Sequence, residues 1–589
     1  MNRNTQSHFA TIPSMDISRS KFDRSFVHKT TCNTGELVPI YVDPDIVPGD
    51  TVTMRMSDLI RMTTPITPVM DDLKADFFFF FIPNRLVWNN FKKFMGENET
   101  APWIQTTEYQ VPQLSIGNDY VYNDKIYNCI EKGSVLDHMG IPTNYKWKPW
   151  SSATPTPSGY ESTRRNIKIT ALPTRAYCLV WNEFFRSEAL QNPVNISKTD
   201  TAHNVYNTNY NGYITYPESS IVNDSQYGGL PCLKVCKTFD YFTACLPRPQ
   251  AGPDVTLPMN GTAPIVTRQF EETGHNTHGD NSNPLYYLPN LETLADNPLV
   301  LGDKVTYTTV GAIETATIDT DDEKTGKLYA DLSSATGATI NQLRTAFAIQ
   351  KWQEREARGG QRYTEMVRSH FNTINPDFRL QRPEYLGGFT HQISMNQVLS
   401  QGNDASGAPI GTTGAYSLST NKNGDVFSHS FTEHGILLGL MCIRQNQHTY
   451  QQGINRAWFK KERFDFYTPE FANLGETYVE LDEIYAQGTS EDKEAFGYQE
   501  RWAEMRYMPD LVSGEMRSDY PTSLDIWHYA DYYDSKPELG NKWIREGTEN
   551  VNRTLAVQDQ DQFKIDLYFG AIYTRPLPVY SVPGLLDHH

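Results

Sequence analysis

Side chains that could bind a metal ion or act on a substrate are few and scattered in this 589-residue chain. The cluster most like a set of metal ligands is His275, His278 and Asp280. It lies in a polar stretch without a predicted helix that would hold the imidazoles on one face. We therefore interpret this cluster as part of a polar loop.

The cysteines and carboxylates also lack a catalytic pattern. The seven cysteines include no CxxC pair, and the closest three, Cys232, Cys236 and Cys245, do not have zinc-site spacing. The chain contains no GxxxxGK[ST] phosphate loop, GxSxG elbow or HExxH pair. No pair among the many acidic residues stands out as glycosidase acids. We predict a protein with no catalytic activity, no cofactor and no metal.

The charge of the chain is uneven. The net charge is −18, from 52 basic and 70 acidic residues. Within residues 1–31, two acids are outnumbered by five basic side chains, which are Arg3, Arg19, Lys21, Arg24 and Lys29. This surplus leaves −21 on the rest of the chain, and such asymmetry is typical of a basic arm on an acidic body. An ordinary solvated terminus is the alternative.

The elements that must position these residues are mainly strands. Residues 77–81 are five consecutive phenylalanines, which in a strand point alternately to both faces. Residues 436–443 are also apolar on both faces, whereas 51–56 and 563–573 alternate apolar and polar. A strand that is apolar on both faces needs a second sheet on one side and a covering layer on the other. The pattern predicts a β-sandwich or barrel with large loops packed outside it.

Helices are predicted in fewer places. Helical apolar spacing is present at residues 86–95 and in a segment from 173 to about 190. A capping box at 339–342 predicts the start of a helix that extends to 358, and a second helix extends to about 371. No apolar run approaches the ~18 residues needed to span a bilayer. Residues 1–30 lack the apolar block of a secretory signal. We expect a soluble protein without membrane insertion.

The composition changes between residues 195 and 335, where Asn, Thr, Tyr, Gly and Pro dominate. The tyrosines that lie among small polar residues there are Tyr206, Tyr210, Tyr213 and Tyr216. Tyrosine among small polar residues is typical of recognition surfaces. The segment is interpreted as an insertion that binds a partner, and a passive surface loop is the alternative.

Eight stretches of this chain resemble one protein family. They are RSKFDRSF at 19–26, KADFFFFFIPNR at 74–85, LPTRAYCLVWNE at 172–183, YFTACLP at 241–247, ARGGQRY at 357–363, RPEYLGG at 382–388, FGYQERWA at 496–503 and YSVPG at 580–584. In this order they resemble the major capsid protein of the small single-stranded DNA phages, the Microviridae, in its gokushovirus branch. The resemblance extends over nearly the whole chain and is weakest at 195–335.

The resemblance implies a mainly β fold, a single eight-stranded antiparallel jelly roll with large loop and helix insertions. It divides the chain into a basic, interior-facing arm (1–31), a first jelly-roll part (32–194), a variable insertion that forms a surface protrusion (195–335), and a helical insertion with the remaining strands (336–589). It also implies self-assembly into a T=1 icosahedral shell around circular single-stranded DNA. The basic residues of the arm would face that DNA, and the tyrosines of the insertion would serve host attachment.

The partners implied are further copies of the chain, packaged DNA, a small basic DNA-binding phage protein, a scaffolding protein and a host surface receptor. The expected location is the virion, assembled in the bacterial cytoplasm. A carbohydrate-binding β-sandwich or glycosidase is the alternative function, and it predicts a monomer with an aromatic cleft. A non-viral DNA-binding protein is a third possibility, which the acidic body disfavours.

Overall fold

The computed structural model describes most of the chain in fifteen stretches. They are residues 18–97, 107–116, 120–122, 125–127, 132–142, 167–200, 203–204, 214–215, 230–253, 255, 265–267, 328–330, 340–360, 362–399 and 413–580. The chain divides into two units, of which one is Met1–Ala251 with Arg355–His589 and the other is Gly252–Glu354. Each unit is described by itself.

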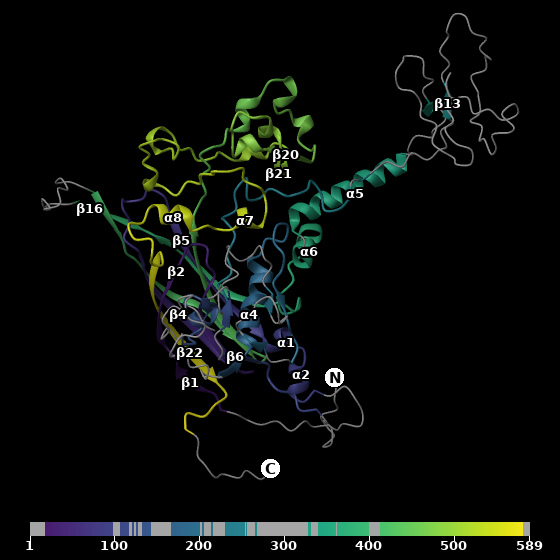
Figure 1. The fold of residues 1–589 in the computed structure, drawn as a ribbon. Helices are drawn as coiled ribbons and strands as arrows, with labels where there is room; N and C mark the ends of the chain where they lie inside the picture. Colours follow the sequence, from purple (N-terminus) through teal and green to yellow (C-terminus); the bar gives the residue numbers. More distant parts are fainter. Residues whose placement is uncertain are drawn as a thin grey trace, which may run out of the picture. The chain divides into compact units, whose positions relative to one another are not determined.

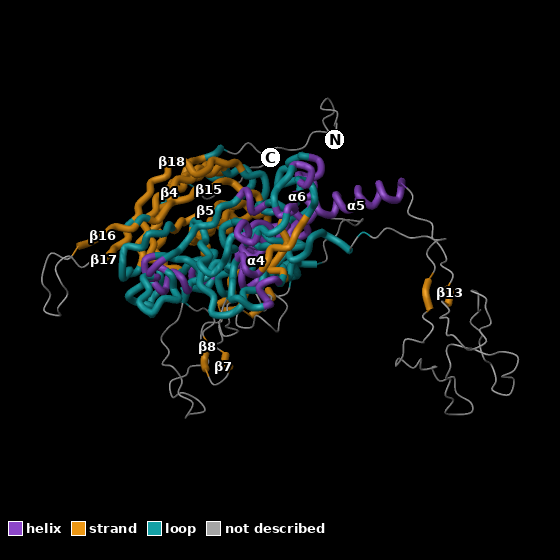
Figure 2. Tube along the Cα trace, turned by 90° about the horizontal axis from the view of Figure 1, so that it is seen from above, coloured by secondary structure: helices purple, strands orange, loops and turns teal. Residues whose placement is uncertain are grey.

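Two antiparallel sheets form the centre of the larger unit (Figures 1 and 2). The first sheet has the strand order β1-β22-β4-β18. β1 pairs with residues 572–575 of β22, and β2 pairs with residues 563–569 of the same strand. The second has the order β15-β5-β19-β3. The first sheet's strands are β1 (Ser20–Asp23), β2 (Phe26–Cys32), β4 (Thr51–Met62), β18 (Ser419–Ser430) and β22 (Phe563–Arg575). Those of the second sheet are β3 (Val38–Ile46), β5 (Leu73–Pro83), β15 (Glu384–Ile393) and β19 (Gly435–Gln445).

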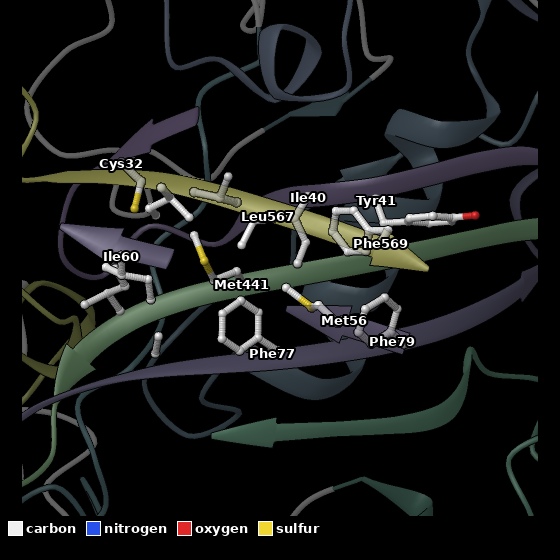
Figure 3. Close-up of a cluster of buried hydrophobic side chains, with 14 of the residues drawn as sticks. Cys32, Ile40, Tyr41, Met56, Ile60, Phe77, Phe79, Met441, Leu567 and Phe569 are labelled. Atoms are coloured by element: carbon white, nitrogen blue, oxygen red, sulfur yellow. The ribbon is translucent and has the colours of Figure 1, made fainter. Parts of the chain in front are cut away.

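The two sheets enclose the main hydrophobic core. Alternate residues of β4 and β22 point into it, so the predicted alternation at 51–56 and 563–573 is confirmed. Figure 3 shows side chains of both sheets meeting there, among them Met56 and Phe569 of the first sheet and Phe79 and Met441 of the second. The mainly β, antiparallel architecture expected from the pattern is therefore present as a sandwich.

The second sheet is covered on its other face as well. Phe77, Phe79 and Phe81 belong to the core between the sheets, whereas Phe80 and Ile82 belong to a second cluster on the opposite side. This second cluster is completed by α4 (Leu172–Val180) and by residues near 230–235, and Figure 1 places α1 and α4 on this side of the sheets. The predicted burial of both faces of the phenylalanine strand is confirmed.

The helices differ from expectation in one place. The continuous helix predicted at 86–95 is wrong, because the segment forms α1 (Asn84–Val87) and α2 (Phe91–Phe94). Between them Trp88 has an extended backbone and is fully buried, and its indole N–H donates to Asp200. The burial and hydrogen bond of the Trp88 side chain accompany an extended backbone at this residue, which interrupts the helix. The helices predicted near 173, 340 and 363 are present as α4, which continues into a π-helical turn η2 (Trp181–Phe185), α5 (Ile340–Gly359) and α6 (Tyr363–Phe371).

The other described elements are short. The paired strands are β6 (Gln113–Ile116) with β9 (Ile167–Thr170) and β11 (His203–Asn204), β7 (Tyr120–Tyr122) with β8 (Lys125–Tyr127), β10 (Asn195–Ile196) with β12 (Ile214–Thr215), β13 (Ile265–Thr267) with β14 (Leu328–Ala330), β16 (Met395–Leu399) with β17 (Thr413–Ser417), and β20 (Glu476–Glu480) with β21 (Ala495–Glu500). The short helices and 3₁₀ turns are α3 (Val135–His138), η6 (Arg456–Phe459), η7 (Arg463–Asp465), η8 (Pro469–Phe471), η9 (Leu481–Glu483), η10 (Ser490–Lys493), η11 (Ala503–Arg506), η12 (Gly514–Met516), η13 (Asp525–Trp527), α7 (Asn541–Ile544) and α8 (Glu549–Arg553).

A buried ionic network lies in the long segment between β19 and β22 and includes one side chain from outside that segment, Lys237. The ammonium of Lys237 lies 2.8 Å from Asp531, and His448 Nε2 lies 2.9 Å from Glu546. His448 Nδ1 is also 3.5 Å from Asp531, which links the two pairs. Burial opposes the charged imidazolium, but Glu546 and Asp531 outweigh it and raise the pKa of His448 to about 9. All four side chains are therefore paired as charges inside the protein.

Candidate nucleic-acid interface

The outward face of the first sheet is polar and open, in contrast to both faces of the second sheet. Side chains that alternate with the core residues of β1, β2, β4, β18 and β22 point to this face. Its described charged residues are six basic side chains, Lys21, Lys29, Arg55, Arg61, Lys422 and Lys564, and three acidic ones, Asp23, Asp425 and Asp566. The surplus is three positive charges on a chain whose net charge is −18. We call these nine residues the basic sheet face.

The ion pairs of this face leave part of its positive charge uncompensated. Lys29 lies 3.4 Å from Asp566 and Arg55 lies 2.8 Å from Asp425, and all four side chains are substantially exposed. Such surface pairs contribute about 0–1 kcal/mol each, so a phosphate can compete for the cation. None of the other basic side chains of the face forms an ion pair within the described part of the chain; they are Lys21, Arg61, Lys422 and Lys564.

A cavity of about 490 Å³ opens at one end of the basic sheet face. Its lining includes Lys29, Arg61 and Lys564 of the face, together with Lys132 and His138 from the segment that carries α3. The lining also includes Asp137 and Asp566, so its four Lys and Arg side chains leave a surplus of two positive charges, which suits an anionic ligand such as a phosphate.

The wall of this cavity is held by buried polar contacts. His138 Nδ1 lies 2.9 Å from the hydroxyl of Thr30, and burial lowers the pKa of this histidine, which favours the neutral imidazole. Lys132 lies 2.9 Å from Asp561. Burial opposes ionisation of Asp561, but Thr31 and Lys132 outweigh it and hold the pKa of that carboxyl below its ordinary value. These contacts attach the 132–138 segment to the edge of the sheet.

The residues predicted to face DNA lie in different environments. Arg3 is outside the described residues. Lys21 is exposed on β1 and Lys29 is exposed on β2, both on the basic sheet face. Arg19 donates to the hydroxyl of Thr51 at 2.8 Å and to the carbonyls of Gly49 and Thr574, so its guanidinium bridges the ends of β4 and β22.

Arg24 has a structural role that the sequence did not indicate. Its guanidinium pairs with Asp43, which is almost fully buried, and lies 4.6 Å from the ring centroid of Tyr573. From residue 20 onward the predicted basic arm is therefore built into strands β1 and β2 of the first sheet.

Substitutions at Arg24 and at Lys29 should change the free energy of unfolding by different amounts, because Arg24 pairs with a buried carboxylate and Lys29 with an exposed one. Arg24→Met should lower the free energy of unfolding by about 1–3 kcal/mol, because it leaves the buried Asp43 without its cation. Lys29→Met should change it by less than about 1 kcal/mol, because its pair is exposed. Denaturant unfolding of the two full-length variants measures the difference. Equal effects would show that Asp43 does not depend on Arg24.

Sequence reasoning did not nominate Arg55, Arg61, Lys422 or Lys564. The signal that could have found three of them is the alternation of β4 and β22, in which Arg55, Arg61 and Lys564 occupy outward positions. Lys422 could not be found this way, because residues 419–425 of β18 are polar or glycine throughout and show no alternation.

The remaining candidate residues are two groups outside the described part of the chain and one group of cysteines within it. The four tyrosines Tyr206, Tyr210, Tyr213 and Tyr216 and the cluster His275, His278 and Asp280 lie outside the described residues. Cys232, Cys236 and Cys245 are free thiols whose Sγ atoms donate to separate partners. Among the described residues, no group of three His, Cys, Asp or Glu side chains could hold a metal ion. The described helices also include none with the length and apolar content to cross a membrane.

Comparison with known proteins gives one consistent result. A family model described as capsid protein (F protein) matches residues 10–585. The chain is 38% identical to capsid protein VP1 of Bdellovibrio phage phiMH2K over 99% of its length and 98% of the relative. It is 36% identical to capsid protein VP1 of Spiroplasma virus 4, over 98% of this chain and 97% of the relative. It is 35% identical to capsid protein VP1 of Chlamydia phage 1, over 98% of each chain.

These matches confirm the predicted resemblance to the gokushovirus branch of the Microviridae and the prediction of a structural virion protein. The relatives are named as capsid proteins, which favours a capsid protein over the glycosidase alternative. The chain belongs to the phage capsid protein (F protein) family.

Proposed function

We propose that copies of this chain assemble into a T=1 icosahedral shell that encloses circular single-stranded DNA, with the basic sheet face turned to the interior. The observation that carries the DNA contact is the surplus of three positive charges on one sheet face of an acidic chain. Cations on this face can neutralise phosphates, and exposed Tyr568 beside them can stack on an unpaired base.

The strand order supports an eight-stranded jelly roll as the framework of the shell. If β1 and β2 are taken as one interrupted strand, each sheet has four strands. Along the chain β3 lies in the second sheet, β4 in the first, β5 and β15 in the second, β18 in the first, β19 in the second and β22 in the first. Repeated crossing between two packed antiparallel sheets is typical of a jelly roll.

The segment 195–335 is proposed as the surface insertion used in host attachment. Support comes from its tyrosine-rich polar composition and from the separate unit Gly252–Glu354, which overlaps much of it. The proposed contact residues are Tyr206, Tyr210, Tyr213 and Tyr216, and the proposed partner is a host surface receptor.

The charge of the chain also supports two partners inside the particle. A chain of net charge −18 cannot neutralise a packaged genome by itself. A small basic DNA-binding phage protein is therefore proposed as a component of the particle, and a scaffolding protein is proposed to guide assembly.

Removing three of the four unpaired cations should test the interior role of the basic sheet face. In the triple variant R61Q/K422Q/K564Q the surplus of three charges on the face falls to zero. We expect shells at normal yield whose nuclease-protected DNA content falls several-fold, because phosphate neutralisation is lost on every subunit. Particles purified after co-expression with the other phage genes are compared by absorbance at 260 and 280 nm and by extraction of their DNA.

The matched control is K92Q/K93Q/K198Q, which removes three positive charges that do not belong to the basic sheet face. This control should package DNA as the unaltered chain does. If both triple variants package equal amounts of DNA, the basic sheet face is not the DNA-facing wall.

A further inference from the structure

A dense group of exposed apolar side chains lies in the segment between β19 and β22. Trp458 is 83% exposed and Leu511 is 79% exposed. The full group comprises Ile454, Trp458, Phe464, Phe466, Tyr467, Leu474, Met505, Met508 and Leu511. We call these nine residues the aromatic patch. From it we infer that segments 454–474 and 501–511 form a contact surface for a second copy of this chain, an inference that rests on the proposed self-assembly.

The two segments of the patch pack against each other. The Trp502 indole N–H donates to the carbonyl of Phe471 at 2.9 Å, and its ring lies 5.5 Å from that of Tyr467. Arg501 donates to the carbonyl of Phe464 at 3.5 Å. Trp502 is buried with a φ of +72°, a left-handed conformation that is unfavourable for a bulky residue. The surrounding contacts thus hold a defined platform for the exposed side chains.

The size of the patch suits a stable protein contact. At roughly 150 Å² for each large side chain, the exposed parts of the nine residues amount to about 800 Å². A standard interface buries about 800 Å² on each partner. One such contact would therefore cover the aromatic patch.

Charge and composition favour a protein over DNA as the occupant. Segments 454–474 and 501–511 contain six basic and five acidic residues, a net charge of +1, and Arg506 is bound to Glu500. This balance contrasts with the surplus of three on the basic sheet face. Trp, Tyr, Phe, Met and Arg are the residues enriched at protein interfaces. In a shell built from one capsid chain, the partner present at every subunit is another copy.

Oxidative footprinting tests the inference on the unaltered chain. Particles purified after co-expression with the other phage genes, and subunits dissociated from them, are exposed to hydroxyl radicals, and oxidation of Trp458, Met505 and Met508 is measured by mass spectrometry. We expect at least a five-fold lower oxidation rate in particles. Equal rates in particles and subunits would overturn the inference while leaving the shell intact, whereas absence of particles would overturn both the shell and this contact.

A variant gives a second measurement. W458S/F464S should reduce the assembled fraction at least ten-fold at fixed concentration, with the unfolding midpoint of the subunit unchanged. The matched control is Phe239→Ser, which alters an aromatic side chain that is 85% exposed outside the patch and should assemble normally. Assembly of W458S/F464S at the level of the control would contradict the inference.

Discussion

Replacing Lys237 with methionine should lower the free energy of unfolding by about 3–5 kcal/mol, because it leaves Asp531 buried without its principal cation. Both side chains are more than nine-tenths buried. Burial favours neutral forms, yet Lys237 holds the pKa of Asp531 well below its ordinary value, and Asp531 in turn raises that of Lys237. The Lys237 ammonium also lies 4.8 Å from the ring centroid of Trp543. Denaturant unfolding of the full-length dissociated subunit measures the loss.

Two controls show whether the loss arises from an unpaired charge. Lys536→Met removes an exposed lysine that is bound to Glu494, and it should not change the unfolding midpoint. The double variant K237M/D531N should recover part of the loss, because no uncompensated carboxylate remains. A double variant less stable than K237M alone would contradict this explanation.

Phe79→Ala and Phe80→Ala should each lower the free energy of unfolding by about 3–5 kcal/mol, although the two rings lie on opposite faces of β5. The ring of Phe79 lies 5.5 Å from that of Phe427 in the core between the sheets. The ring of Phe80 lies 4.8 Å from that of Phe184 in the covering layer. Both truncations would open cavities in closely packed surroundings, and denaturant unfolding measures the cost.

The matched control is Phe239→Ala, an exposed position at which the same truncation should change stability by less than about 0.5 kcal/mol. A small loss for Phe80→Ala beside a large one for Phe79→Ala would mean that the layer over the second sheet is loose. The burial of β5 on both faces would then be wrong.

Much of the sandwich could be predicted because strand patterning is a local property of the sequence. The alternation of β4 and β22 and the two-sided apolar runs of β5 and β19 can each be read within about a dozen residues. The break between α1 and α2 could not be predicted, since it depends on an indole contact from Trp88 to Asp200. That contact joins residues more than one hundred positions apart.

The candidate interface was predicted in part for the same reason. Lys21 and Lys29 belong to a basic segment that composition reveals, and both lie on the basic sheet face. The use of Arg24 to neutralise buried Asp43 depends on the pairing of strands and is not visible in the sequence. The residues that enlarge the face come from β4, β18 and β22, strands brought together only by long-range pairing.

Sedimentation with negative-stain microscopy tests the central claim most directly. The protein is co-expressed with its neighbouring phage genes and compared with a variant that lacks residues 252–335, the part of the proposed insertion that lies in the smaller unit. We predict uniform closed particles far heavier than the 67.2 kDa chain, with surface protrusions that are absent from the deletion variant. A monomer that persists with every phage partner present, and that binds a glycan, would contradict the assembly of this chain into a shell.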